Sequence, residues 1–216
     1  MVEERAEVTS LWASGERMVA FLLGSSASWE HLLHETYLPA RHVEEGRNVG
    51  VYRTALLNTT AGPFGGRLAV TMRPYLPSQL AAVAGLTSRY PGAHGAPLHW
   101  GDASDLGVSI DSVPDWGEQV TIRDGEVPVF WASGTSALDA ISEAELPFAI
   151  TSAPGHLLVS DLTDSELHVP NLAEDPSQAV ETRACRACTS RRARVNYETP
   201  WQPPRRSRRG GGSSRV

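Results

Sequence analysis

Hydrophobic residues recur with a helical period in three parts of the chain. In residues 28–38 ("SWEHLLHETYL") the apolar positions are Trp29, Leu32, Leu33 and Tyr37. This spacing places them on one face of an amphipathic helix, for which Ser28 is the expected N-cap and Pro39 the stop. Residues 77–90 and 136–145 have comparable patterns, so we expect helices there as well.

Short apolar or alternating runs lie between these helices and predict strands. The clearest is residues 67–74 ("RLAVTMRP"), which alternates in polarity and contains strand-favouring residues. Shorter candidates are residues 96–101, 120–122, 127–133 and 157–162. Because helices and strands interleave along the chain, we expect an α/β (mixed α+β) fold with a mixed sheet.

Length and composition indicate a folded body rather than a fibrous or disordered chain. The 216 residues are 41% hydrophobic and 20% charged, which is enough for one domain or two small ones. No apolar run approaches the ~20 residues of a membrane helix, and the acidic start ("MVEERAEVTSLW") does not have the pattern of a secretory signal. We therefore expect a cytoplasmic protein with no membrane partner.

The last part of the chain differs sharply in charge from the rest. Residues 171–216 hold 10 of the 19 arginines but only 4 of the 25 acidic residues, among many Pro, Gly and Ser. This composition predicts a disordered Arg-rich C-terminal tail. Its charge could attract nucleic acid, but aromatic residues are nearly absent, which favours a solvated extension without a nucleic-acid partner. Cys185 and Cys188 form one CxxC without the second pair that a structural zinc site needs.

Residue types that the chain lacks exclude several kinds of enzyme. Every basic residue is an arginine, so a lysine Schiff base and with it pyridoxal-phosphate chemistry are excluded. No loop has the lysine of a Walker A motif, and no GxGxxG dinucleotide fingerprint is present. We therefore expect neither pyridoxal phosphate nor a nucleotide cofactor.

Glycine-rich loops carry polar groups that suit proton transfer. The loop "HGAPLHWGD" contains His94, His99 and Asp102, and His156 follows the turn "APG". Histidine titrates near neutral pH, so each could shuttle protons, although a structural hydrogen bond explains each histidine equally well. The H-x4-H-x2-D spacing fits no standard metal site, so we expect no metal.

Residues 41–54 ("RHVEEGRNVGVYRT") concentrate charge and hydrogen-bonding groups. Arg47 and Arg53, with Arg73 further along, lie in predicted loops or strand ends, where guanidinium groups can hold a carboxylate. Glu45 could orient an arginine or exchange protons. The alternative is a helix end with a glycine C-cap and solvated charges, and spacing alone does not decide between the two.

Seven segments together resemble the hydro-lyase family that includes the D-glutamate cyclases. In chain order they are "FLLGSSASWE", "RHVEEGRNVGVYRT", "AGPFGGRLAVTMRP", "TSRYPGAHGAPLHWGD", "PDWGEQV", "GEVPVFWASGTS" and "PFAITSAPGHLLVSDL". The resemblance extends over residues 21–162. It implies a two-lobed α/β fold, no cofactor, and cyclisation of D-glutamate to 5-oxo-D-proline with loss of water.

The chain departs from this family's pattern in three places. Ser25 and Ser133 stand where the motifs usually have cysteine. The first motif keeps its other polar positions, Ser26, Ser28 and Glu30. Family members also carry further residues before this motif, so we expect a non-family segment at 1–20 followed by an N-terminally truncated D-glutamate cyclase-like domain at 21–165.

The chemistry of a lactam-forming dehydration suggests roles by residue type. The candidate proton shuttles are His94, His99 and His156, oriented by Asp102 or Glu45. The candidate substrate-binding groups are Arg47, Asn48, Tyr52, Arg53 and Arg73, with oxyanion donors in the loops of Gly65 and Gly134. The implied partner is a small carboxylate substrate; the alternatives are a carboxylate-binding module without turnover and an inactive truncated member. The sequence leaves the oligomeric state open.

Overall fold

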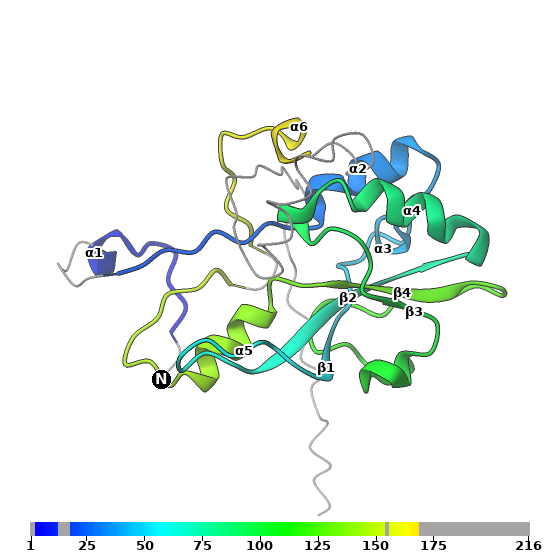
Figure 1. The fold of residues 1–216 in the computed structure, drawn as a ribbon. Coiled ribbons are helices and arrows are strands. Elements are labelled where there is room, and N and C mark those ends of the chain that lie inside the picture. The colour runs from blue at the N-terminus through cyan, green and yellow to red at the C-terminus, as the bar shows by residue number, and fades with distance from the viewer. Residues whose placement is uncertain (1–2, 13–17, 154–155, 169–216) are drawn as a thin grey trace, which may run out of the picture.

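The computed structural model describes residues 3–12, 18–153 and 156–168 of the chain. In chain order the elements are α1 (Thr9–Trp12), α2 (Ala27–Glu35), α3 (Arg41–Glu44), β1 (Val51–Leu57), β2 (Arg67–Tyr75), the 3-10 turn η1 (Pro77–Gln79), α4 (Leu80–Thr87), η2 (Pro91–Ala93), β3 (His99–Trp100), η3 (Ala103–Leu106), β4 (Val127–Ala132), α5 (Ser136–Glu143) and α6 (Asp164–Leu167) (Figure 1). The predicted mixture of helices and strands is therefore confirmed.

A four-stranded sheet in the order β1-β2-β4-β3 forms the centre of the described residues. All three strand pairs are antiparallel, so the expected mixed sheet is corrected to an antiparallel one. The short connection between β1 and β2 brings the chain directly back alongside itself, whereas a parallel pair needs a longer crossover. The division into two lobes and the boundaries of the domain at 21–165 stay predictions.

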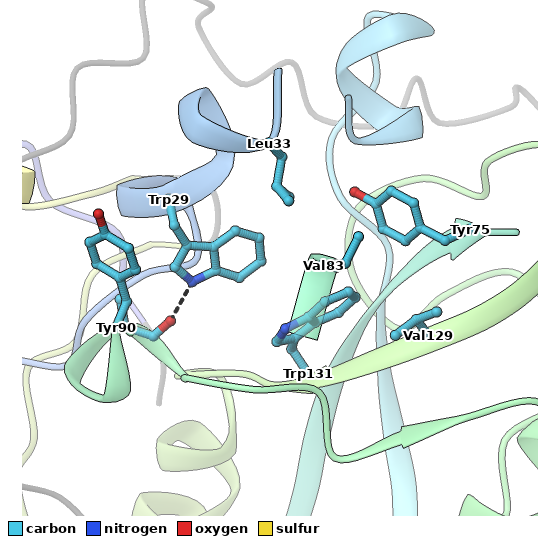
Figure 2. Close-up of a cluster of buried hydrophobic side chains, with 8 residues drawn as sticks. Trp29, Leu33, Tyr75, Val83, Tyr90, Val129 and Trp131 are labelled. Atoms are coloured by element: carbon cyan, nitrogen blue, oxygen red, sulfur yellow. Dashed lines mark hydrogen bonds between the residues drawn. The ribbon is translucent and has the colours of Figure 1, made fainter. Parts of the chain in front are cut away.

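The two faces of the sheet support separate hydrophobic clusters. In Figure 1, α2 and α4 lie together on one side of the sheet. The cluster on that side consists of Trp29, Leu33, Tyr75, Val83, Tyr90, Ala93, Val129 and Trp131 (Figure 2). The cluster on the opposite side consists of Tyr52, Val70, Met72, Ala103, Leu106, Val108, Val120 and Phe130. Neighbouring residues of β4, namely Val129, Phe130 and Trp131, alternate between the two clusters, as the pleat of a strand requires.

Helix α2 begins and ends earlier than the sequence pattern predicts. Its N-cap is Ser26, not Ser28, which is fully buried in the first turn. The helix ends at Glu35, and Tyr37 then takes a left-handed conformation with φ of 59°. This conformation turns the Tyr37 side chain away from the predicted apolar face, and it is 90% exposed.

The strand predictions are confirmed in part. Strands β3 and β4 lie within the predicted segments, and β2 extends one residue beyond its segment, to Tyr75. Strand β1 was not among the predicted strands. Residues 120–122 and 157–162 are not strands, although both are apolar. A run of β-favouring residues becomes a strand only when a neighbouring strand satisfies its backbone groups, and these two runs have none among the residues described.

The predicted tail, residues 171–216, lies outside the described residues, as does its CxxC. Across the described ranges, none of the helices is both long enough and apolar enough to traverse a lipid bilayer.

Candidate active site

The centre of the candidate site is a buried arginine. Arg73 lies within β2 and is 0% exposed. Its guanidinium carbon is 4.9 Å from the ring centroid of Trp29 and 5.2 Å from that of Trp131. Stacking between aromatic faces suits the flat, weakly hydrated guanidinium group.

Hydrogen bonds compensate for the burial of this charge. Arg73 Nε donates to Glu30 Oε1 at 3.1 Å, and Nη2 donates to the same oxygen. The remaining bonds run from Nη1 to Thr71 Oγ1 at 3.0 Å and from Nη2 to Ser26 Oγ at 2.8 Å. Because a buried unpaired charge costs several kcal/mol, the arginine and the glutamate depend on each other.

The periodicity of helix α2 places the polar partners of Arg73 in the core. Ser26, Trp29, Glu30 and Leu33 are spaced as i, i+3, i+4 and i+7, and all four are buried. Such spacing defines one face of a helix, so Glu30 and Ser26 enter the core beside the aromatic and aliphatic residues.

A histidine from α3 meets the other oxygen of the glutamate. His42 Nε2 lies 3.4 Å from Glu30 Oε2, with both side chains less than a tenth exposed. Its neighbour Arg41 is also buried and donates to Glu44 at 2.7 Å and to Glu126 at 2.7 Å. Arg41 therefore fastens α3 to the segment that leads into β4.

His94 lies beside this charged cluster. It follows η2 in a left-handed conformation with φ of 78°. The carbonyl just before it, Ala93 O, accepts a 2.7 Å hydrogen bond from Trp29 Nε1, which ties the loop to α2 (Figure 2). Desolvation by burial and, less strongly, the Arg73 charge lower the pKa of His94 from 6.5 to about 4, although Glu30 opposes the shift. The imidazole is therefore neutral at physiological pH.

Two glycines allow separate segments to meet at His94. A Cβ on Gly134, which precedes α5, would lie 3.9 Å from both His94 Cε1 and Gly24 O. The starts of α2 and α5 therefore approach each other beside the imidazole. The first N–H groups of both helices already donate within their own turns, such as Ser28 N to Ser25 O and Ser136 N to Ser133 O. What the two helix starts offer is a partial positive charge, which favours anions.

Gly24→Ala is expected to disturb this meeting point. A Cβ at Gly24 would lie 1.9 Å from Gly92 O, a backbone atom that cannot rotate away. We expect a loss of about 1–3 kcal/mol in the free energy of unfolding, as for other overpacked sites. Urea denaturation measures this loss. The matched control is Gly85→Ala at an exposed position of α4, where the new Cβ meets nothing within 4 Å and should stabilise the helix by roughly 0.5–1 kcal/mol. Equal stability of Gly24→Ala and wild type would contradict the close approach.

Of the predicted site residues, Arg73, His94 and Gly134 gather in this region. His99 lies on the opposite face of the sheet, where it pairs with Phe130 in the strand register and stacks near it at 6.0 Å. Its Nε2 contacts Asp102 O at 2.9 Å, and the Asp102 carboxylate caps η3 by accepting from Ser104 N at 2.9 Å.

Tyr52, Arg53 and Gly65 also lie elsewhere. Tyr52 belongs to the cluster on the opposite face, and its hydroxyl has no hydrogen-bond partner among the residues described. Arg53 donates to Asp139 at 2.9 Å and covers the ring of Trp116 at 4.5 Å. Gly65 lies against Glu143.

An open depression of about 270 Å³ lies over α5 and the start of β2. Its lining residues are Arg53, Arg67, Asp139, Ser142 and Glu143. Asp139 already binds Arg53, and Glu143 accepts from Gly66 N at 2.7 Å. We favour the cluster at Arg73 because Arg73 and Glu30 are almost fully buried, whereas the Arg53 side chain at the depression is 45% exposed.

The remaining predicted residues surround the end of α3. Arg47 donates to Gln119 O, and Asn48 N donates to Glu118 at 2.9 Å. Glu45 accepts from Thr121 N at 3.2 Å. Gly46 follows the helix with φ of 61°. The alternative interpretation, a helix end with a glycine cap, thus describes the local backbone.

His156 lies in an exposed segment, where its backbone N–H donates to Ala153 O at 3.0 Å. Among the described ranges, no three His, Cys, Asp or Glu side chains come together as a group that could hold a metal ion. Glu30, Ser26 and His42 were not among the predicted site residues. The first two could have been found, because they share the helical face of Trp29; His42 had no comparable signal.

Comparisons with known proteins identify one family. Residues 19–161 match the D-glutamate cyclase family. A protein named "Putative hydro-lyase" from Mycolicibacterium gilvum is 48% identical over 170 residues, which cover 79% of this chain and 64% of that protein. One of the same name from Saccharopolyspora erythraea is 46% identical over 170 residues, 79% of this chain and 66% of the relative. This chain thus spans just under two thirds of the relatives' length, and it belongs to the D-glutamate cyclase family.

Proposed function

We propose that this chain is a hydro-lyase that acts on a small amino acid carboxylate, with D-glutamate and 5-oxo-D-proline as the interconverted pair. The observation that carries the proposal is a neutral His94 beside the buried Arg73–Glu30 ion pair. Membership of the D-glutamate cyclase family supports the reaction class.

The reaction requires proton transfers. It involves no change in oxidation state and no transfer of a group to a carrier. The amine nitrogen of glutamate attacks the γ-carboxyl carbon, a C–N bond forms, and a C–O bond breaks. The ammonium group gives up two protons in total, and the departing oxygen receives two and leaves as water. A group that accepts protons from the ammonium and returns them to the oxygen therefore serves both halves of the reaction.

His94 is neutral in the folded protein, so a ring nitrogen can accept a proton, and its pKa of about 4 makes the protonated form a strong acid toward the departing oxygen. The starts of α2 and α5 beside it would stabilise the negative oxygen of the tetrahedral intermediate through their partial positive charge. Arg73 is fully buried, so it would supply positive charge to the site without contacting the substrate. Roles for the more distant residues, including Arg47 and Arg53 as a carboxylate clamp, stay predictions.

A turnover assay tests the proposal directly. The full chain is incubated with D-glutamate, and 5-oxoproline is followed by chromatography, with L-glutamate in parallel. Formation of 5-oxoproline in proportion to protein concentration is the expected result.

Thermal shifts with a panel of amino and hydroxy acids separate the alternatives. Stabilisation by a carboxylate without any product would indicate a binding module, and neither stabilisation nor product would indicate an inactive member. Either result would overturn the proposed activity.

A further inference from the structure

The charged stretch at residues 41–47 has a structural purpose that a carboxylate clamp does not explain. The first two residues of α3, Arg41 and His42, are each 5% exposed. Arg41 satisfies its guanidinium with Glu44, Glu126 and the carbonyl of Thr121 at 3.1 Å. These contacts hold the four-residue helix α3 in place. The side chain of His42, which follows Arg41, therefore has a fixed position.

The ion pair that His42 approaches is asymmetric. Arg73 Nε and Nη2 both donate to the same oxygen of Glu30, Oε1. A contact on the second oxygen fixes the plane of a carboxylate more firmly than contacts on one oxygen alone. Oε2 lies 3.4 Å from His42 Nε2, which supplies such a contact.

The other ring nitrogen of His42 shows which proton faces the glutamate. Nδ1 is buried and has no hydrogen-bond partner among the described residues. A protonated Nδ1 there would bury an unsatisfied donor, which costs about 1–3 kcal/mol. The tautomer with its proton on Nε2 directs an N–H at the Glu30 carboxylate, whereas the other tautomer would direct a lone pair at it and be repelled.

We propose that His42 is a positioning residue of the candidate site. Its Nε2–H holds Oε2 of Glu30, so that Oε1 stays on Arg73 and the charge of Arg73 stays beside His94. The effect on catalysis rests on the proposed function; the effect on Glu30 and Arg73 does not.

Two amide substitutions distinguish positioning from mere polarity. His42→Gln places an amide nitrogen near the position of Nε2, and His42→Asn places it near that of Nδ1. Both are polar and small enough for the site. The Nε–H signal of Arg73 in ¹H–¹⁵N spectra of the full chain reports its bond to Glu30 Oε1, and it is assigned by its shift in Glu30→Gln.

We expect the Arg73 signal to keep its position in His42→Gln and to move in His42→Asn. We also expect kcat to fall about 10-fold or more in His42→Asn with little change in KM, and to be largely retained in His42→Gln. The control is His34→Asn on the exposed side of α2, which should alter neither readout.

Equal behaviour of the Gln and Asn variants in the Arg73 signal would overturn the inference, whether both signals move or neither does. If wild type shows no turnover, the proposed function fails, but the spectra still decide whether His42 positions Glu30.

Discussion

Replacing Arg73 with Met is expected to lower the free energy of unfolding by about 3–5 kcal/mol. Arg73 is 0% exposed, and Glu30, its partner, is 7% exposed. Removal of the guanidinium leaves the glutamate carboxylate buried without its main counter-charge. The methionine fills much of the space between Trp29 and Trp131, so the loss measures charge rather than volume. Urea denaturation of the purified protein gives the value.

A second variant separates the unpaired charge from the loss of packing. In Arg73→Met with Glu30→Gln, the buried negative charge is gone, and we expect the double variant to be more stable than Arg73→Met alone. The control is Arg123→Met, because that side chain is 60% exposed and lies 3.8 Å from Glu44. Exposed pairs contribute at most about 1 kcal/mol. A loss of that small size at Arg73 would mean that Glu30 is not held as a buried carboxylate.

The strand that carries Arg73 shows how far the sequence predicts the fold. The segment "RLAVTMRP" was correctly expected to be a strand, and β2 covers Arg67–Tyr75. The pattern did not show that β2 lies in the middle of the sheet. Most of both faces of this strand are buried, so its arginine lies in the core and not on a solvent-exposed face. A charged residue in a strand usually indicates a solvated face. Only the structure shows that α2 supplies the opposite charge.

Only some of the predicted site residues come together in the described structure, and their roles stay predictions. Arginine, histidine and a glycine loop do meet, at Arg73, His94 and Gly134. Arg53 was an equally reasonable candidate by residue type, but its partner Asp139 lies 86 residues further along the chain. Hydrophobic patterns and residue spacing report on structure over one or two turns of a helix. They cannot show which acid, distant in the sequence, neutralises an arginine.

Strand register explains why His99 and His94 separate despite lying five residues apart. Trp131 and Phe130 are adjacent in β4 and therefore lie on opposite faces of the sheet. Between the two histidines the chain crosses from the face of Trp131 to the face of Phe130. A shift of one residue in the register would exchange the two faces. The histidine spacing in "HGAPLHWGD" therefore carried no information about which of the two joins the charged cluster.

Replacing His94 with Asn is expected to reduce kcat by about 100-fold or more if the imidazole moves the proton. Asparagine suits this position because it tolerates the left-handed conformation that His94 adopts, with φ of 78°, and because its amide cannot accept a proton at neutral pH. The measurement is kcat and KM for D-glutamate conversion. The matched control is His34→Asn, which makes the same change on an exposed turn of α2 and should leave both constants unchanged.

The pH dependence of stability tests His94 without any assay of turnover. Its folded pKa is about 4, below the ordinary value of 6.5, so between these values the unfolded chain binds a proton that the folded chain does not. Wild type should therefore lose stability as the pH falls from about 6.5 to about 4, and keep the full contribution above that window. His94→Asn should lack this component, so its unfolding free energy should fall less steeply over the same range than that of wild type or His34→Asn. Parallel curves for all three proteins would mean that His94 titrates as a solvated histidine, and the neutral base on which the proposed chemistry depends would be absent.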